Sequence, residues 1–248
     1  MIRKLAILVP ILSLSFFSVA HAADPVSSIL PGIDLGSNDP GNVSNTLRII
    51  LLITVLSIAP AILILMTCFT RIIVVLGFVR NALGTQQIPP NQVMIGLALF
   101  MTFFIMGPTF SKINQEALQP LTAGKITQEE AYQAASEPLK EFMAKQTREK
   151  DLALFMDYAG MKRPEHVKDI PITALVPAFA ISELKTAFQM GFIIFIPFLV
   201  IDMIVSSVLM SMGMMMLPPV MISLPFKILL FILVDGWNLI IKSLLTSF

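Results

Sequence analysis

The residues that could do chemistry here are a few ionisable side chains inside long uncharged stretches: Asp202, Lys227, Asp235 and Lys242. A charge at the centre of a bilayer costs about 2.5 to 3.5 kcal/mol on insertion scales, so each should face protein or water. They could form a proton or ion relay. Alternatively, Asp202 could pair with Lys227 or with a partner subunit as an assembly lock, while Lys242 snorkels near a helix end. We favour the lock, because a relay needs a chain of such groups and the sequence offers few.

Two further charges, Glu183 and Lys185, come just before an apolar stretch. They predict either an assembly pair or an ordinary charge pair at the membrane interface.

The second candidate site is the methionine-rich stretch MSMGMMMLPP at 210–219. Its methionines are Met210, Met212, Met214, Met215 and Met216, and its helix-breaking residues are Gly213, Pro218 and Pro219. Methionine is flexible and polarizable, so it repacks around changing shapes. Broken backbone leaves polar groups that lipid cannot satisfy, which predicts a position inside protein or beside a wet cavity. Repeated around a symmetric ring, such a segment could close a pore by dewetting. The alternative is a hairpin tip packed against lipid or neighbours.

Signatures of enzymes are missing. The sequence has no Walker A loop, no HExxH pair and no GxSxG elbow. Cys68 is the single cysteine and should be a buried small hydrophobe, and His166 should be an exposed polar residue. We therefore expect no catalytic residue, no metal and no cofactor, and the net charge of +1 predicts no nucleic-acid surface.

Composition predicts a membrane protein: 56% of residues are hydrophobic and 13% are charged, and the mean hydropathy is +0.83. Residues 1–22 read as a cleavable signal peptide, with Arg3 and Lys4 before a short apolar run and Ala20-His21-Ala22 at the cleavage site. An irregular exported segment should follow over 23–46.

Four hydrophobic helices are predicted in an all-α fold of membrane hairpins. The first pair, 49–70 and 93–110, lies in a segment 47–111, and the loop 71–91 between the two should face the cytoplasm because it carries Arg71 and Arg80 and no acid. The second pair, 187–209 and 224–245, lies in 181–248 and meets at a hairpin tip over 210–221.

Between the pairs, 112–180 should form an exported segment of two or three amphipathic helices. Thr127 and Glu130 are spaced as a capping box. Pro138 is expected to start a new helix, and Gly160 to stop one.

Two long stretches, 69–108 and 181–237, closely resemble the export-gate family shared by flagellar and virulence-associated type III secretion systems, the FliP/MopC/SpaP family. They include FTRIIVVLGFVRNALG and VLMSMGMMMLPPVMISLPFK, and the matching layout covers roughly 45–247. The signal peptide fits the flagellar branch better than the injectisome branch.

This resemblance implies a core subunit of a protein export gate in the bacterial inner membrane, at the flagellar basal body, with a periplasmic segment. It implies a homo-oligomeric helical ring, pentameric by resemblance, which with FliQ, FliR and other gate components passes unfolded flagellar subunits. It also implies that the methionine loop lines the constriction, at Met214, Met215 and Met216, and that the hairpins stand above the membrane plane after assembly.

Two alternative functions remain at this point. The chain could be a small-solute or ion transporter using Asp202 and Asp235, which predicts an internal inverted repeat. It could also be a membrane scaffold that conducts nothing.

Overall fold

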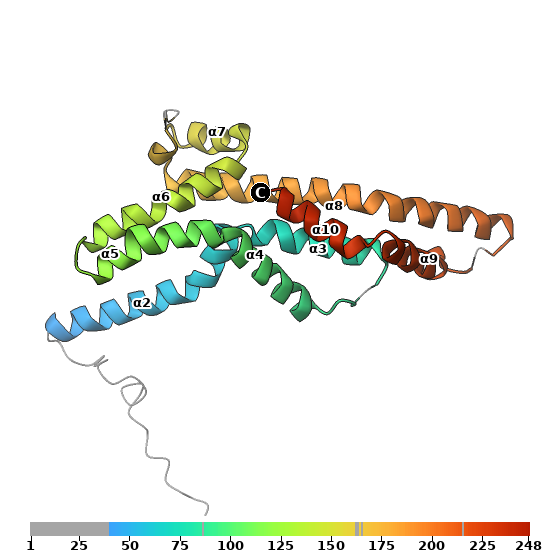
Figure 1. The fold of residues 1–248 in the computed structure, drawn as a ribbon, viewed down its shortest axis with the longest axis horizontal. Helices are drawn as coiled ribbons and strands as arrows, with labels where there is room; N and C mark the ends of the chain where they lie inside the picture. The colour runs from blue at the N-terminus through green and yellow to red at the C-terminus, as the bar shows by residue number, and fades with distance from the viewer. Residues whose placement is uncertain (1–39, 86, 162–163, 165, 215) are drawn as a thin grey trace, which may run out of the picture. The chain divides into compact units, whose positions relative to one another are not determined.

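The structure is a computed structural model that describes residues 40–85, 87–161, 164, 166–214 and 216–248, without the side chains of 40–48, 59 and 63. Every regular element within these ranges is a helix (Figure 1). The chain divides into two compact units, Met1–Ala59 and Pro60–Phe248. In the first unit, the described residues belong to α2 (Pro40–Leu65), so the last seven residues of the predicted irregular segment, 40–46, are helical. The predicted signal peptide lies outside the described residues.

The first predicted hydrophobic helix, 49–70, ends sooner than the hydropathy indicates. Helix α2 ends at Leu65, and α3 (Phe69–Ala82) begins after a short turn. Hydroxyl groups satisfy backbone groups at the break, since Thr70 Oγ1 donates to the carbonyl of Ile64 and Thr67 Oγ1 accepts from the amide of Phe69. Such local side-chain bonds compete with the helical ladder, which explains why an uninterrupted apolar run changes helix here.

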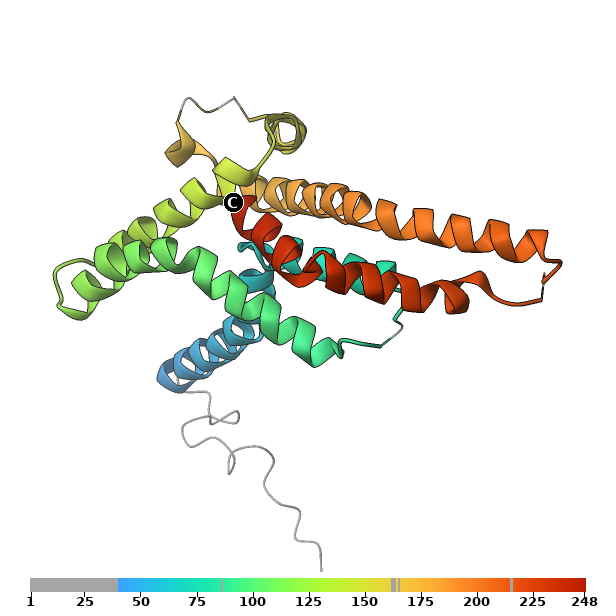
Figure 2. The same ribbon diagram turned by 45° about the vertical axis from the view of Figure 1, so that its right-hand side comes forward.

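The segment 71–91 is mostly helix and not the predicted loop. Helix α3 occupies 69–82 and packs along α8 (Ile172–Ser211), the longest helix of the described chain, with 40 residues (Figures 1 and 2). Their contact surface belongs to the main core, which also contains the fully buried Cys68, as predicted. The α3 side chains in this core include Ile72, Val75, Leu76 and Val79. Their spacing is that of one helix face.

Close approach of α3 and α8 depends on Gly191. A Cβ added at Gly191 would overlap Cγ and Cδ2 of Phe78 and would lie 2.9 Å from the Cβ of Phe78. Phe78 is also held by an edge contact with the ring of Phe188, with 5.4 Å between the centroids. The phenylalanine ring of α3 therefore occupies the space that any other residue at 191 would need.

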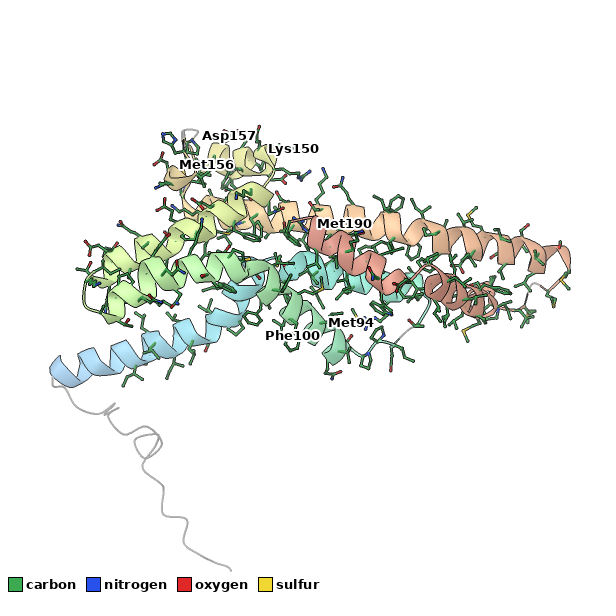
Figure 3. All side chains as sticks on the ribbon, in the orientation of Figure 1. Met94, Phe100, Lys150, Met156, Asp157 and Met190 are labelled. Carbon is green, nitrogen blue, oxygen red and sulfur yellow. The ribbon has the colours of Figure 1, made fainter. Side chains whose placement is uncertain are left out.

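Two described helices are long and apolar enough to cross a membrane. One is Asn91–Thr122, formed by α4 (Asn91–Ile113), the π-helical η1 (Asn114–Leu118) and α5 (Gln119–Thr122), and the other is α8. They contain the second and third predicted spans. Figure 3 shows α4 with Met94, which is buried, and Phe100, which is 78% exposed.

The fourth predicted span is a bent pair. Helix α9 (Pro219–Leu233) and α10 (Gly236–Thr246) meet at 63° and could count as a third span only together. The described apolar part of α2, Ile49–Ile62, is shorter than a span. The four continuous hydrophobic helices of the sequence prediction are thus two long helices, one bent pair and one shorter helix.

The predicted exported segment contains two amphipathic helices, α6 (Gln128–Gln146) and α7 (Glu149–Tyr158), followed by the one-turn η2 (Val167–Asp169). The capping box is confirmed: Glu130 Oε2 accepts from the amide of Thr127 at 2.7 Å, and Thr127 Oγ1 accepts from the amide of Glu130 at 3.3 Å. The helix stop near Gly160 is also confirmed, and His166 is exposed. The prediction for Pro138 is wrong, because this proline lies buried inside α6.

Helix α7 is fixed to α8 by a buried carboxylate. Ser182 Oγ donates to Asp151 Oδ2 at 2.7 Å and accepts from the amide of Arg148 at 3.1 Å, while Arg148 Nη2 lies 2.5 Å from Asp151 Oδ2. Burial by itself raises the pKa of Asp151, but the hydrogen bond from Ser182 and the charge of Arg148 outweigh it, so this pKa lies below its ordinary value.

This lowered pKa gives the α7 contact a defined pH dependence. A carboxyl whose pKa is lower in the folded state stabilises the fold fully above its unfolded pKa, and the stabilisation is lost as pH falls through the folded pKa. We expect the difference in unfolding free energy between wild type and Asp151→Asn to be constant above about pH 5 and to shrink below about pH 4. Chemical unfolding of both proteins in detergent between pH 3 and 7 measures it. A difference that does not change with pH would contradict the assignment.

Candidate functional site

The methionine-rich segment forms the turn between α8 and α9, as predicted. Met210, Met212 and Met216 are exposed, Met216 by 98%, and Met214 is half-buried. Met215 lies outside the described residues. Figure 1 shows this turn leading from the far end of α8 back to the start of α9. The described methionines of the tip are thus largely uncovered by their own chain.

The backbone of this turn is better satisfied than the sequence suggests. The amide of Gly213 donates to the carbonyl of Met210, and the amide of Met214 donates to the carbonyl of Leu209 at 3.0 Å. With Gly213 at φ +76°, this is a Schellman motif, which closes the end of α8. Pro218 precedes α9 and Pro219 is its first residue, where a missing amide costs nothing. The expectation of unpaired backbone groups is therefore wrong for the amides of Gly213 and Met214, and for the rest of the turn it stays a prediction.

Asp202 of α8 meets Lys227 of α9, one of the two partners that the sequence left open. Lys227 Nζ donates to Asp202 Oδ2 at 2.7 Å, and Ser223 Oγ donates to Asp202 Oδ1 at 2.5 Å. Lys227 is buried and Asp202 is partly exposed. The turn after α3 also lies close to this pair, since a Cβ added at Gly84 would be 3.8 Å from Lys227 Nζ. Both acceptor oxygens are engaged, so this pair joins the two arms of the hairpin near its tip.

Glu183 is not paired with Lys185. Lys185 is exposed, whereas Glu183 is fully buried and binds Arg71 of α3. Arg71 Nε donates to Glu183 Oε2 at 2.9 Å, and Arg71 Nη2 donates to Glu183 Oε1. This two-pronged geometry is the strong form of an arginine–carboxylate pair. Arg71 is 2% exposed, so it is not a surface charge of a cytoplasmic loop. Of the two arginines from which the cytoplasmic position of 71–91 was predicted, only Arg80 still supports that position.

The remaining donors of Arg71 join two more elements to this pair. Nη2 donates to Gln146 Oε1 of α6 at 2.9 Å, and Nη1 donates to the carbonyl of Ser247 at 2.8 Å and to its hydroxyl at 3.0 Å. The guanidinium lies 4.0 Å from the ring centroid of Phe248, and Gln146 Nε2 donates to the carbonyl of Phe248. Arg71 therefore connects α3, α6, α8 and the residues that follow α10. We call the five residues Arg71, Gln146, Glu183, Ser247 and Phe248 the Arg71 cluster.

Sequence reasoning missed the Arg71 cluster, although one signal was present. Arg71 lies on the same helical face as Cys68, Ile72, Val75 and Val79, at steps of three and four residues. An arginine inside an apolar stripe needs a buried acid, and Glu183 is an acid at the start of another apolar stretch. Nothing in the sequence indicates Gln146 or Ser247 as further acceptors.

Asp235 does not lie within a continuous helix. It occupies the bend between α9 and α10 with φ 51° and ψ 53°, in the left-handed region that aspartate tolerates better than most residues. Its side chain is exposed. Asp235 and Asp202 belong to different environments, and within the described residues no contact joins them.

These helices and buried charge pairs define an all-α protein whose described residues include helices long and apolar enough to cross a membrane, beside the amphipathic helices α6 and α7. The FliP family model matches residues 52–244. The flagellar biosynthetic protein FliP of Bacillus subtilis (strain 168) is 74% identical over 212 residues, which cover 86% of this chain and 96% of that protein. The same-named protein of Pectobacterium carotovorum subsp. carotovorum is 51% identical over 228 residues (91% and 88%), and that of Aquifex aeolicus (strain VF5) is 48% identical over 226 (90% and 94%).

The chain belongs to the FliP family. It is a non-enzymatic membrane protein of flagellar biosynthesis and export. The resemblance of residues 69–108 and 181–237 to this family is thereby confirmed.

Proposed function

We propose that the chain is a core subunit of the flagellar protein export gate. Several copies, together with FliQ and FliR, would form the channel that passes unfolded flagellar subunits across the inner membrane. Family membership supports this role. The apolar surface of the single chain supports a multi-subunit assembly, since Phe100, Phe104, Phe192 and Ile193 are each at least 65% exposed on α4 and α8. Large exposed apolar patches are typical of surfaces that bind other proteins or lipid.

Within this gate, the methionine-rich tip would act as the gasket. The observation that carries the proposal is the exposure of Met210, Met212 and Met216 on a turn whose start, at the end of α8, is held by backbone hydrogen bonds of Gly213 and Met214. A fixed turn places flexible apolar side chains at a defined position, while the side chains themselves remain free to repack. Arranged around a symmetry axis, they would exclude water and ions and still yield to a passing chain.

Replacing Met214, Met215 and Met216 by alanine should raise ion leak through the assembled complex several-fold and leave assembly intact. Alanine keeps the turn but removes the volume that closes the pore. Conductance of membranes containing the complex with FliQ and FliR measures the leak, and size analysis measures assembly. The matched control is Met203→Ala, which removes a 62% exposed methionine of α8 outside the tip. Unchanged conductance in the triple variant would count against the gasket.

The transporter alternative loses support from the geometry of its two acids. Asp202 is engaged by Lys227 and Ser223, while Asp235 is exposed at the bend. This arrangement favours the assembly-lock interpretation of Asp202, although its role between subunits stays a prediction. An image of the purified complex distinguishes the gate from a non-conducting scaffold by the presence of a central channel with the tip beside it.

A further inference from the structure

An open groove of about 580 Å³ lies between α4, α6 and the C-terminal end of α10, where Leu245 and Phe248 line it. Its apolar lining residues include Phe104, Pro108 and Leu245. Its polar lining residues are Thr109, Lys112, Glu141, Lys145 and Gln146. We call it the α4–α6 groove. Its volume is that of a site for a small molecule or for part of a lipid.

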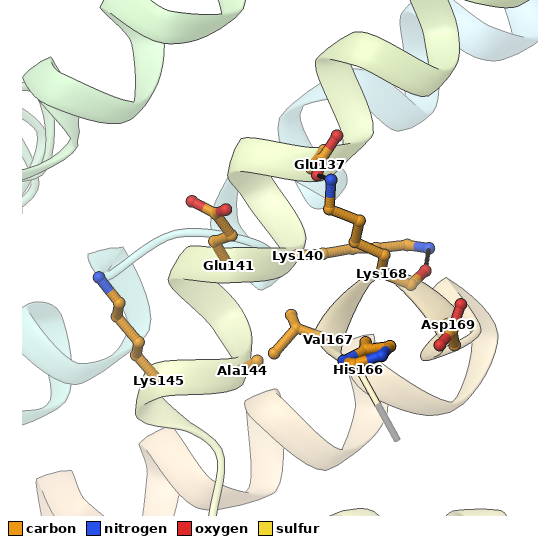
Figure 4. A pocket seen from close by; sticks show the side chains of 9 residues that line it. All are labelled: Glu137, Lys140, Glu141, Ala144, Lys145, His166, Val167, Lys168 and Asp169. Carbon is orange, nitrogen blue, oxygen red and sulfur yellow. Dashed lines mark hydrogen bonds and ion pairs between the residues drawn. The ribbon is translucent and has the colours of Figure 1, made fainter. Parts of the chain in front are cut away.

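The groove lining has two lysines, Lys112 and Lys145, and one carboxylate, Glu141, so one positive charge is in excess. Lys112 Nζ lies 3.3 Å from Glu141 Oε2 in an exposed pair, which costs little to open. Lys145 makes no ion pair with any residue that the structure describes. In the adjoining charged pocket, Lys168 binds Glu137 and Lys140 donates to the carbonyl of Lys168 at 2.9 Å, so these lysines are occupied (Figure 4). Lys145 stands apart from them in that view.

The order of chemistry along α4 matches that of a phospholipid. Lys112 comes just after the apolar part of the helix, where lysine side chains reach the headgroup level. Phe104 precedes it by about two helical turns, or about 12 Å along the axis, and is 75% exposed. A phosphate beside Lys112 and Lys145 would thus place an acyl chain over Phe104, Pro108 and Leu245.

We propose that the α4–α6 groove binds one phospholipid with an anionic headgroup. Its phosphate contacts Lys112 and Lys145, and one acyl chain lies against the apolar lining residues. The assignment is independent of the gasket, because none of these residues belongs to the methionine-rich tip. Each lysine near an anionic headgroup contributes about 1 kcal/mol, so the two together should give at least a tenfold preference over a zwitterionic lipid.

Native mass spectrometry of the full chain in detergent, titrated with phosphatidylglycerol or with phosphatidylcholine of the same acyl chains, tests this proposal. We expect about tenfold tighter retention of phosphatidylglycerol. The double variant Lys112→Gln/Lys145→Gln should lose this preference, whereas Lys112→Arg/Lys145→Arg should keep it. The matched control is Lys150→Gln, which removes an exposed lysine of α7 outside the groove (Figure 3). Phe104→Ser should weaken the retention of both lipids equally.

Three results would overturn the proposal. Equal retention of the two lipids by wild type would remove the role of charge, and an unchanged preference in the double glutamine variant would place the lipid elsewhere. Competition by sn-glycerol 3-phosphate at the concentrations at which phosphatidylglycerol binds would show a site for a soluble phosphate. Folding of each variant is checked by its unfolding midpoint. If the double glutamine variant is unstable, the single variants Lys112→Gln and Lys145→Gln decide the test, because each should lose part of the preference.

Discussion

Replacing Arg71 by methionine is expected to lower the unfolding free energy by about 3 to 5 kcal/mol, because it leaves Glu183 buried without a counter-charge. Glu183 is fully buried, and its two oxygens both accept from the guanidinium. The variant also removes the donors to Gln146 and Ser247. Chemical unfolding of the purified chain in detergent measures the loss.

The control for this experiment is Lys112→Gln, which breaks an exposed ion pair and should cost at most about 1 kcal/mol. The double variant Arg71→Met/Glu183→Leu should recover part of the loss, because it removes the uncompensated charge together with its partner. An equal loss in the double variant would mean that the contacts to α6 and Ser247, and not the ion pair, dominate the stability of the Arg71 cluster.

The second large effect is expected at Gly191. Gly191→Ala should destabilise the chain by about 1 to 3 kcal/mol, because the added methyl group overlaps the ring of Phe78 and forces α3 and α8 apart. The same substitution at Gly77 of α3, where no atom lies within 4 Å of the added Cβ, should instead be neutral or stabilise by about 0.5 to 1 kcal/mol. Unfolding midpoints of the two variants provide the comparison.

Phe78→Leu should rescue part of the Gly191→Ala loss, since the smaller side chain vacates the space that the methyl group needs. If Gly191→Ala and Gly77→Ala had equal effects, the close packing of α3 on α8 would not depend on the absence of a side chain at 191.

What the sequence could predict was local. The capping box of Thr127 and Glu130 closes within three residues, and the stop at Gly160 depends on one backbone conformation. Both can therefore be predicted without knowledge of the fold. The apolar runs within α4 and α8 can be predicted as well, because bilayer thickness sets the length that an apolar helix needs to cross it. The turn at the methionine-rich tip was predicted from Gly213 and the two prolines, because these residues interrupt a helix locally.

Errors arose where a distant partner decides the structure. Arg71 reads as a loop charge until Glu183, 112 positions later in the chain, is brought beside it. Hydropathy predicts one helix over 224–245, but the left-handed conformation of Asp235 bends it. Pro138 stays inside α6 because the buried contacts of the helix outweigh one missing hydrogen bond. Each of these outcomes depends on tertiary packing, which single-residue preferences do not contain.

The length of α8 has a consequence for the cell. A helix of 40 residues is about 60 Å long, twice the roughly 30 Å of a hydrocarbon layer, and would need a tilt of about 60° to fit within it. Membrane helices tilt on average only about 20°, so part of α8 should lie outside the hydrocarbon layer, and a copy without neighbours leaves apolar side chains such as Phe192 and Ile193 without a protein partner. Orphan copies should therefore be targets for chaperones and proteases, and synthesis of the protein must keep pace with the supply of its assembly partners.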